Sequence, residues 1–149
     1  QMELFARVAA ADTVDFLEIE LPDQNGKKVK LSDVHNKVTL VYFWTASDAA
    51  QKMFNLDALL PVYKKYHDKG FNIYQVSLDV DNGMWARVMK EQKLPWISVC
   101  DGLGANSPYT ILYNIGALPS TFIISDGELV DGQVVNENSL RRTVAKLLK

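Results

Sequence analysis

The residues of this chain that could do chemistry gather behind one apolar run. Residues 38–44 read Val-Thr-Leu-Val-Tyr-Phe-Trp, a three-residue turn follows, and a helical pattern opens at Asp48. A buried strand that leads into a helix favours reactive groups at the junction, because free backbone N–H groups and the helix dipole meet there. We therefore take this junction as the candidate site.

Two polar side chains fall in the first turn of that helix. Asp48 stands at the expected N-cap and Gln51 three residues later, a pattern like the capping box, in which each side chain approaches the other residue's backbone N–H. A cap of this kind stabilises a helix by about 1 kcal/mol. This pattern favours a structural role for Asp48 over a catalytic one.

Cys100 is the single cysteine, so no intramolecular disulfide can form. Strand alternation groups it with Trp96 and Ser98, and no His lies within a few residues to activate it. We interpret it as a small residue packed at a strand end, with a reactive thiol as the weaker alternative. His35 and His67 lie far apart and no Cys or His pair has ligand spacing, so we expect no metal site.

Composition narrows the classes of function. The 149 residues fit one domain, residues 1–149, and no apolar run approaches the roughly 20 residues that a membrane span needs. The 16 basic and 18 acidic residues are scattered, so we expect no nucleic-acid partner and no membrane contact by this domain itself. A Gln at position 1, without a signal-peptide pattern after it, indicates a processed or excised fragment.

Hydrophobic periodicity predicts the elements that hold the junction. Residues 1–13 fit either a short docked helix or a frayed end, and residues 14–31 predict a β-hairpin around an Asn-Gly turn. Residues 38–44 are apolar on both faces, which is typical of an interior strand. The helix of residues 49–67 should turn one stripe to the core and kink at Pro61; the stripe is Met53, Leu56, Leu60 and Tyr63.

The rest of the chain continues an α/β pattern. A strand at residues 71–78 should lie parallel to the first, because a right-handed crossover connects them. Further expected elements are a helix at 84–92, a strand at 96–100, a helical turn from Ser107, a hairpin of 121–124 with 129–134, and an amphipathic helix at 139–149 that covers one face of the sheet.

Six pieces of the sequence carry a resemblance to a known family. They are Asn25–Ser32, the strand end Phe43-Trp44, Tyr63–Tyr66 with Lys69-Gly70-Phe71, Val76–Asp79, Leu94-Pro95-Trp96, and Leu118–Phe122. Together they resemble the thioredoxin-like superfamily, specifically the bacterial ResA/TlpA-like thiol–disulfide oxidoreductases, which are related to the AhpC/TSA peroxiredoxins. The resemblance implies a thioredoxin-like α/β fold: a central mixed β-sheet flanked by helices, with an N-terminal β-hairpin extension.

The resemblance also implies a redox motif that this chain lacks. In the family the strand ending Phe-Trp leads to Cys-x-x-Cys, whereas Asp48-Ala49-Ala50-Gln51 fills those positions here. Neither Asp nor Gln can exchange a disulfide, because the reaction needs a thiolate and a second thiol to resolve the mixed disulfide. Tyr42 stands where thioredoxins carry a buried acid. Asp48 and Gln51 are therefore vestigial redox positions, and we expect no confident catalytic residue and no cofactor.

A substrate-facing groove is the part of the family's site that this sequence retains. Pro119 stands where the family has a cis-proline whose preceding residue pairs with extended substrate. The resemblance thus implies a ligand groove made of Trp44, Ser47, Asp48, Leu118 and Pro119, with a peptide or protein as partner.

Three functions stay open at this point. The favoured one is a peptide-binding or structural module with a degenerate, redox-inactive site. The first alternative is a thiol–disulfide oxidoreductase or peroxidase that acts through Cys100 with a partner thiol, and the second is a structural domain without a ligand. The relatives work in the bacterial periplasm or cell envelope, so the resemblance implies that compartment.

Overall fold

The computed structural model describes residues 16–34, 36–130 and 136–149. Its strands are β1 (Glu20–Pro22), β2 (Lys28–Lys30), β3 (Val38–Trp44), β4 (Phe71–Ser77), β5 (Ile97–Cys100), β6 (Ser120–Ser125) and β7 (Glu128–Val130). Its helices are α2 (Ala49–Phe54), α3 (Leu60–Tyr66), α4 (Asn82–Gln92), α5 (Pro108–Leu112) and α6 (Glu137–Leu147). The expectations for residues 1–13, and for 131–134 of the last hairpin, lie outside the described residues.

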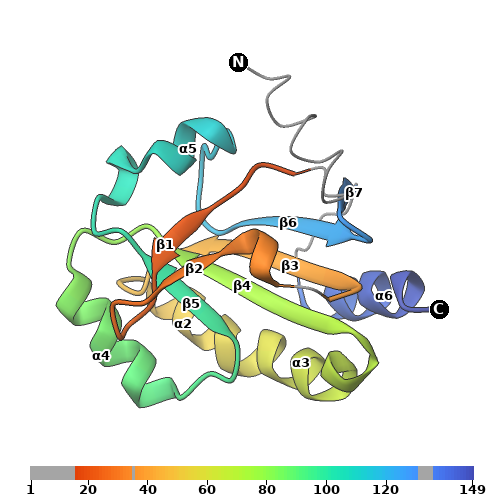
Figure 1. Cartoon of the computed structure of the whole chain (residues 1–149). Coiled ribbons are helices and arrows are strands. Elements are labelled where there is room, and N and C mark those ends of the chain that lie inside the picture. The colour runs from red at the N-terminus through yellow and green to blue at the C-terminus, as the bar shows by residue number, and fades with distance from the viewer. Residues whose placement is uncertain (1–15, 35, 131–135) are drawn as a thin grey trace.

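The central sheet has five strands in the order β5-β4-β3-β6-β7 (Figure 1). β3 pairs parallel with β4 and antiparallel with β6, which makes the sheet mixed. All seven residues of β3 are buried, as the run of apolar residues predicted, because layers cover both faces of the sheet. This interior strand ends at the candidate junction.

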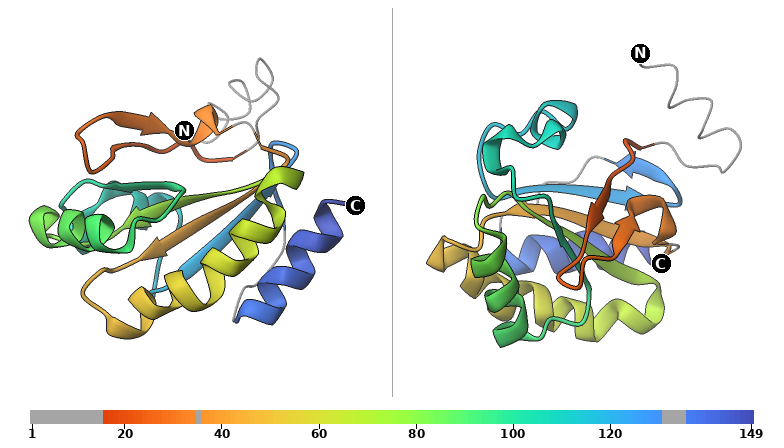
Figure 2. Two further views of the ribbon diagram at one scale, coloured as in Figure 1. Left: turned by 90° about the horizontal axis from the view of Figure 1, so that it is seen from below. Right: turned by 60° about the vertical axis from the view of Figure 1, so that its left-hand side comes forward.

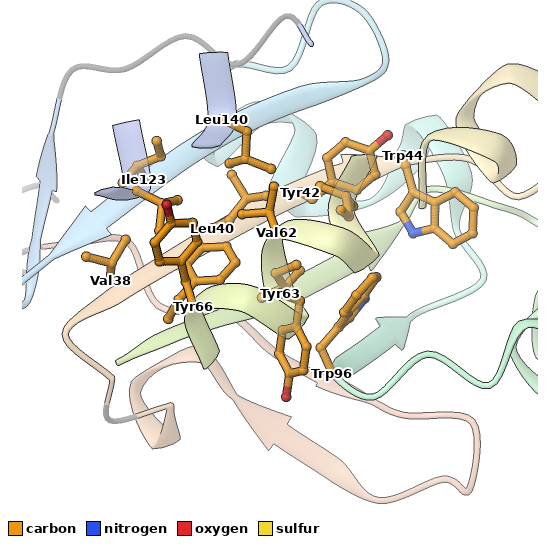
Figure 3. Packing of buried hydrophobic residues seen from close by; sticks show 14 of the residues in the cluster. Val38, Leu40, Tyr42, Trp44, Val62, Tyr63, Tyr66, Trp96, Ile123 and Leu140 are labelled. Carbon is orange, nitrogen blue, oxygen red and sulfur yellow. The ribbon is translucent and has the colours of Figure 1, made fainter. Parts of the chain in front are cut away.

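Helices cover one face of the sheet. Buried side chains of β3, α3, α4 and α6 form one core cluster there, and Figure 3 shows Tyr42, Trp44, Val62 and Leu140 among them. In Figure 2 (left) α3 and α6 lie together beneath the sheet. The predicted amphipathic C-terminal helix is confirmed, because α6 buries Leu140 and Val144 on this face.

The N-terminal hairpin covers the opposite face (Figure 2, left). β1 and β2 pair antiparallel with Leu21 opposite Val29, which confirms the predicted hairpin with a first strand shorter than expected. Two tyrosine hydroxyls anchor this segment: that of Tyr74 donates to the Val29 carbonyl at 2.7 Å, and that of Tyr113 donates to the Leu17 carbonyl. No helix in the described part of the chain is both long and apolar enough to cross a bilayer.

The predicted core stripe of the long helix is wrong in its first half. Met53 is 51% exposed and Leu56 36% exposed, whereas the polar residues Gln51 and Asn55 are buried. Asn55 is held inside by hydrogen bonds, since its side-chain oxygen accepts from Gln75 Nε2 at 2.6 Å. The helix therefore turns a polar edge toward the sheet and an apolar edge toward solvent.

The second half of the helix follows a shifted stripe. Residues Asn55–Leu59 form a π-helical turn between α2 and α3. A π turn adds a residue to the helical repeat, so the side chains that reach the core after it are Leu59, Val62, Tyr63 and Tyr66. The irregularity expected at Pro61 lies just before it, at this π turn, and Pro61 removes one backbone donor from the helix that continues through α3.

Candidate functional site

The ends of four strands bring the candidate site together. Trp44 at the end of β3 is level with Ser77 on β4, Ser77 is level with Cys100 on β5, and Ser120 opens β6 opposite Phe43. The segments that join these ends are residues 45–48, 78–83, 101–107 and 114–119, which we call the site loops. They lie at the left of Figure 1, where the chain enters α4 and α5.

The start of α2 is closed by two side chains. Asp48 is the N-cap, and its Oδ1 accepts from the backbone N–H of Ala50 at 2.9 Å. The buried Gln51 donates from Nε2 to Asp48 Oδ2 at 2.9 Å, and its Oε1 accepts from the backbone N–H of Thr45 at 2.8 Å. The helix start thus has both a cap and a bridge to the preceding turn.

This geometry corrects the predicted capping box. Asp48 caps the helix as expected, but it bonds the N–H of Ala50 and not that of Gln51. Gln51 in turn bonds the carboxylate of Asp48 and the N–H of Thr45. The reciprocal box fails because Gln51 faces inward, where the backbone of the 45–48 turn offers a donor within reach.

Asp79 is a buried carboxylate that the sequence reasoning did not single out. Its Oδ1 accepts from Thr45 Oγ1 at 2.6 Å, and its Oδ2 accepts from the Ala46 N–H at 2.9 Å and from the Ser77 hydroxyl. Only 5% of its surface is exposed. Three donors are what a buried carboxylate needs, so Asp79 fixes the 45–48 turn to the end of β4. The sequence feature that could have identified Asp79 is its position, two residues after the end of a buried strand.

Cys100 is packed beside this cluster. Its side chain is 1% exposed, and its Sγ lies 3.7 Å from the Asp79 carbonyl oxygen and 3.6 Å from Asn82 Oδ1, with the thiol donating. Burial raises the pKa of the Cys100 thiol above its usual range. The predicted packing at a strand end is confirmed, and the surroundings favour the unreactive, protonated thiol.

Tyr42 and Trp44 lie beneath the junction on the helix-covered face. Tyr42 stacks on Phe54 with ring centroids 5.8 Å apart, and its hydroxyl is buried without a hydrogen-bond partner among the described residues. Burial, and secondarily the charge of Asp48, raises the pKa of Tyr42 well above its usual value. Tyr42 therefore fills the space under α2 as a neutral side chain.

Trp44 cannot contact a ligand in the groove, which corrects one of the predicted site residues. Its side chain is fully buried in the cluster of β3, α3, α4 and α6 (Figure 3). Leu78 and Leu118 belong to the cluster on the other face of the sheet. Successive strand residues point to opposite faces of the sheet. The Trp44 side chain, at the end of β3, therefore points away from Leu78 and Leu118.

A pocket of about 230 Å³ lies at the predicted groove. It is lined by Leu78, Ala105, Thr110, Ile115, Gly116, Ala117 and Leu118. The Leu118–Pro119 peptide bond is cis. Ser47, Asp48 and Pro119 are at the surface around the junction without lining the pocket, so of the predicted groove residues Leu118 alone does so.

The backbone beside this pocket is free to pair. Among the residues that the structure describes, none bonds the N–H or the carbonyl of Leu118, because the β3–β6 ladder begins at Ser120. The side chain of Ser120 turns back to the Ala117 carbonyl at 2.6 Å. An extended segment could use the Leu118 groups as a ladder partner. Within residues 16–34, 36–130 and 136–149, no group of three His, Cys, Asp or Glu side chains could hold a metal ion.

Comparisons with known proteins agree with this geometry. The AhpC/TSA family model matches residues 14–132. The thiol–disulfide oxidoreductase ResA of Bacillus cereus is 26% identical over 129 residues, which are 85% of this chain and 71% of that protein.

Solved structures extend the likeness to the whole fold. An uncharacterised thioredoxin-like protein from Bacteroides vulgatus is 37% identical with a TM-score of 0.75, over 90% of this chain and 86% of that one. A thiol–disulfide oxidoreductase from Bacteroides fragilis is 27% identical with a TM-score of 0.77, over 88% and 97%. This chain therefore belongs to the AhpC/TSA family and is a thioredoxin-like protein of the ResA/TlpA-like kind.

Proposed function

We propose that this domain binds an extended segment of another protein at the site loops and does not exchange disulfides. The observation that carries the proposal is the closed helix start, where Asp48 and Gln51 bond each other and the Thr45 N–H. These two residues stand at the positions that the family resemblance gives to the redox cysteines. Carboxylate and amide groups cannot attack a disulfide, so the site lacks the nucleophile of its relatives.

Cys100 is a poor substitute for the missing thiols. A thiol reacts as its thiolate, and burial raises the pKa of Cys100. The sulfur is almost wholly enclosed, with Asp79 and Asn82 as its hydrogen-bond acceptors. An incoming disulfide would have to displace the loops around it, which argues against the alternative of an enzyme that acts through Cys100.

Binding is supported by groups that stay available at the surface. The unpaired backbone of Leu118 offers one donor and one acceptor to an extended chain, and the neighbouring pocket offers apolar walls for a side chain. Val80 is 75% exposed and Leu103 47% exposed on the adjacent loops. Main-chain pairing with an apolar pocket is how extended peptides are recognised at sheet edges. By family resemblance we expect the partner in the bacterial envelope.

An array of overlapping, cysteine-free decapeptides, probed with the labelled domain, tests the binding. We expect the wild type to be retained on a subset of peptides and Leu118→Glu to lose that signal. Leu129→Glu is the matched control, because Leu129 is also partly exposed but lies on β7, away from the site loops. No retention of the wild type, or equal retention of both variants, would contradict the proposal.

A further inference from the structure

The site loops carry charge of one sign only. They contain Asp48, Asp79, Asp81 and Asp101, and no Lys, Arg or His. The whole chain has a net charge of −2, so the rest of the molecule is net positive by two charges. The nearest cations along the chain are Lys52, four residues after Asp48 in α2, and Arg87, six residues after Asp81 in α4. The excess negative charge of the protein is thus concentrated in the site loops.

These carboxylates are not neutralised within the domain. Within the described ranges the single ion pair is Arg141–Glu137 on α6, far from the site loops in sequence. Asp48 and Asp81 accept from backbone N–H groups as helix caps, which leaves their charges at the surface. Asp101 accepts from the Leu103 N–H through Oδ1, and its Oδ2 is buried without a hydrogen-bond partner among the described residues.

Apolar surface lies next to this charge. Val80 follows the buried Asp79, and it touches the 101–107 loop so closely that a Cβ on Gly104 would come within 2.7 Å of it. On the same loops Leu103 and Val80 are exposed, and Leu78 lines the pocket with Ile115 and Leu118. The pocket and these acidic side chains therefore belong to the same loops at one edge of the sheet, and we call the carboxylates the acidic rim of the groove.

From this complementarity we infer that the groove takes an extended segment in which an aliphatic side chain is flanked by Lys or Arg. This inference rests on the proposed function and names its class of ligand. The aliphatic side chain fills the pocket at Leu118, and the flanking cations meet Asp48 and Asp81 at the rim. Acidic flanks would be repelled, so the rim selects the ligand as well as attracting it.

Three synthetic hexapeptides with the same central Leu-Val pair test the inference, flanked by two Lys, two Ser or two Glu on each side. Titration calorimetry or fluorescence anisotropy would give their dissociation constants at 50 and 500 mM NaCl. We expect the Lys peptide to bind about tenfold more tightly than the Glu peptide at low salt, and the two to converge at high salt, because surface charges are screened.

Charge-neutral variants locate the effect. Asp48→Asn/Asp81→Asn should weaken the Lys peptide about fivefold at low salt while keeping both helix caps, since Asn caps as well as Asp. Asp68→Asn/Asp126→Asn is the matched control at the other end of the sheet and should change nothing. Equal binding of all three peptides, or preference for Glu flanks, would overturn the charge inference and leave peptide binding intact. Binding of none of them would overturn both.

Discussion

At the scale of single residues, Asp48 and Gln51 turn a helix start suited to a thiolate into a closed turn. The carboxylate accepts from the Ala50 N–H and from the Gln51 amide, while Gln51 also accepts from the Thr45 N–H. The Ala50 N–H, one of the donors at the helix start, is thus already engaged by a side chain of the chain itself. This is a stabilising use of the same dipole and N–H groups.

Asp48→Ala should lower the free energy of unfolding by roughly 0.5–2 kcal/mol, because it removes the cap and the partner of Gln51. Asp48→Asn should lie between the wild type and the Ala variant, since its amide oxygen can still accept from the Ala50 N–H but its NH2 group would face the Gln51 Nε2 donor. Urea denaturation followed by circular dichroism gives both values. An Ala variant as stable as the wild type would show that the cap contributes nothing.

The sequence predicted the position of this cap but not all of its partners. Residue type and spacing are enough to place Asp48 at the N-cap, because that preference is local. Asp79 could not be assigned in the same way, since its donors at Thr45 and Ala46 are 34 and 33 residues away along the chain. Long-range hydrogen bonds produce no periodic pattern in a sequence.

At the scale of elements, the helix that follows the site is held by a buried polar network. Asn55 accepts from Gln75 Nε2 on β4 and donates to Gln92 Oε1 on α4 at 2.9 Å, and Gln92 Nε2 donates to the Lys52 carbonyl at 3.1 Å. Gln75 also accepts from the Trp96 indole N–H at 3.0 Å. The network joins α2, α4 and the sheet beneath the candidate site.

Asn55→Ala should destabilise the domain by about 1–3 kcal/mol, because Gln75 and Gln92 would each lose a buried partner. Asn106→Ala, at an exposed position in the 101–107 loop, is the matched control and should stay within about 0.5 kcal/mol of the wild type. Urea midpoints compare the three proteins. Equal losses of stability in the two variants would show that the buried network does not stabilise the domain more than an exposed side chain does.

The strands were predicted better than this helix for a physical reason. β3 and β4 are covered on both faces of the sheet, so each appears in the sequence as a largely apolar run, which is typical of an interior strand. In the helix, the stripe of Met53 and Leu56 has correct helical spacing, but hydrogen bonds hold the polar Asn55 inside, opposite to what hydrophobicity favours. A π turn then shifts the register of the following residues, and no residue pattern indicates it.

At the scale of the whole molecule, one sheet serves two different layers. Helices cover the face that buries Trp44, and the N-terminal hairpin with α5 covers the face that contributes Leu78, Ile115 and Leu118 to the pocket. The two layers meet at the edge of the sheet where β3, β4 and β5 end. At this edge the capped start of α2 lies on the same set of loops as the apolar pocket and the acidic side chains. In our proposal this groove takes an extended segment, although Asp48 and Gln51 stand where the family resemblance places the thiols.

An insulin-reduction assay with dithiothreitol tests this account most directly. The proteins compared at equal concentration are the wild type, Cys100→Ala and Asp48→Cys/Gln51→Cys, each first shown to be folded by circular dichroism. We expect the first two to remain at the background rate, and the double variant to rise above it because it regains a dithiol at the helix start. Insulin reduction by the wild type that Cys100→Ala abolishes would contradict the account.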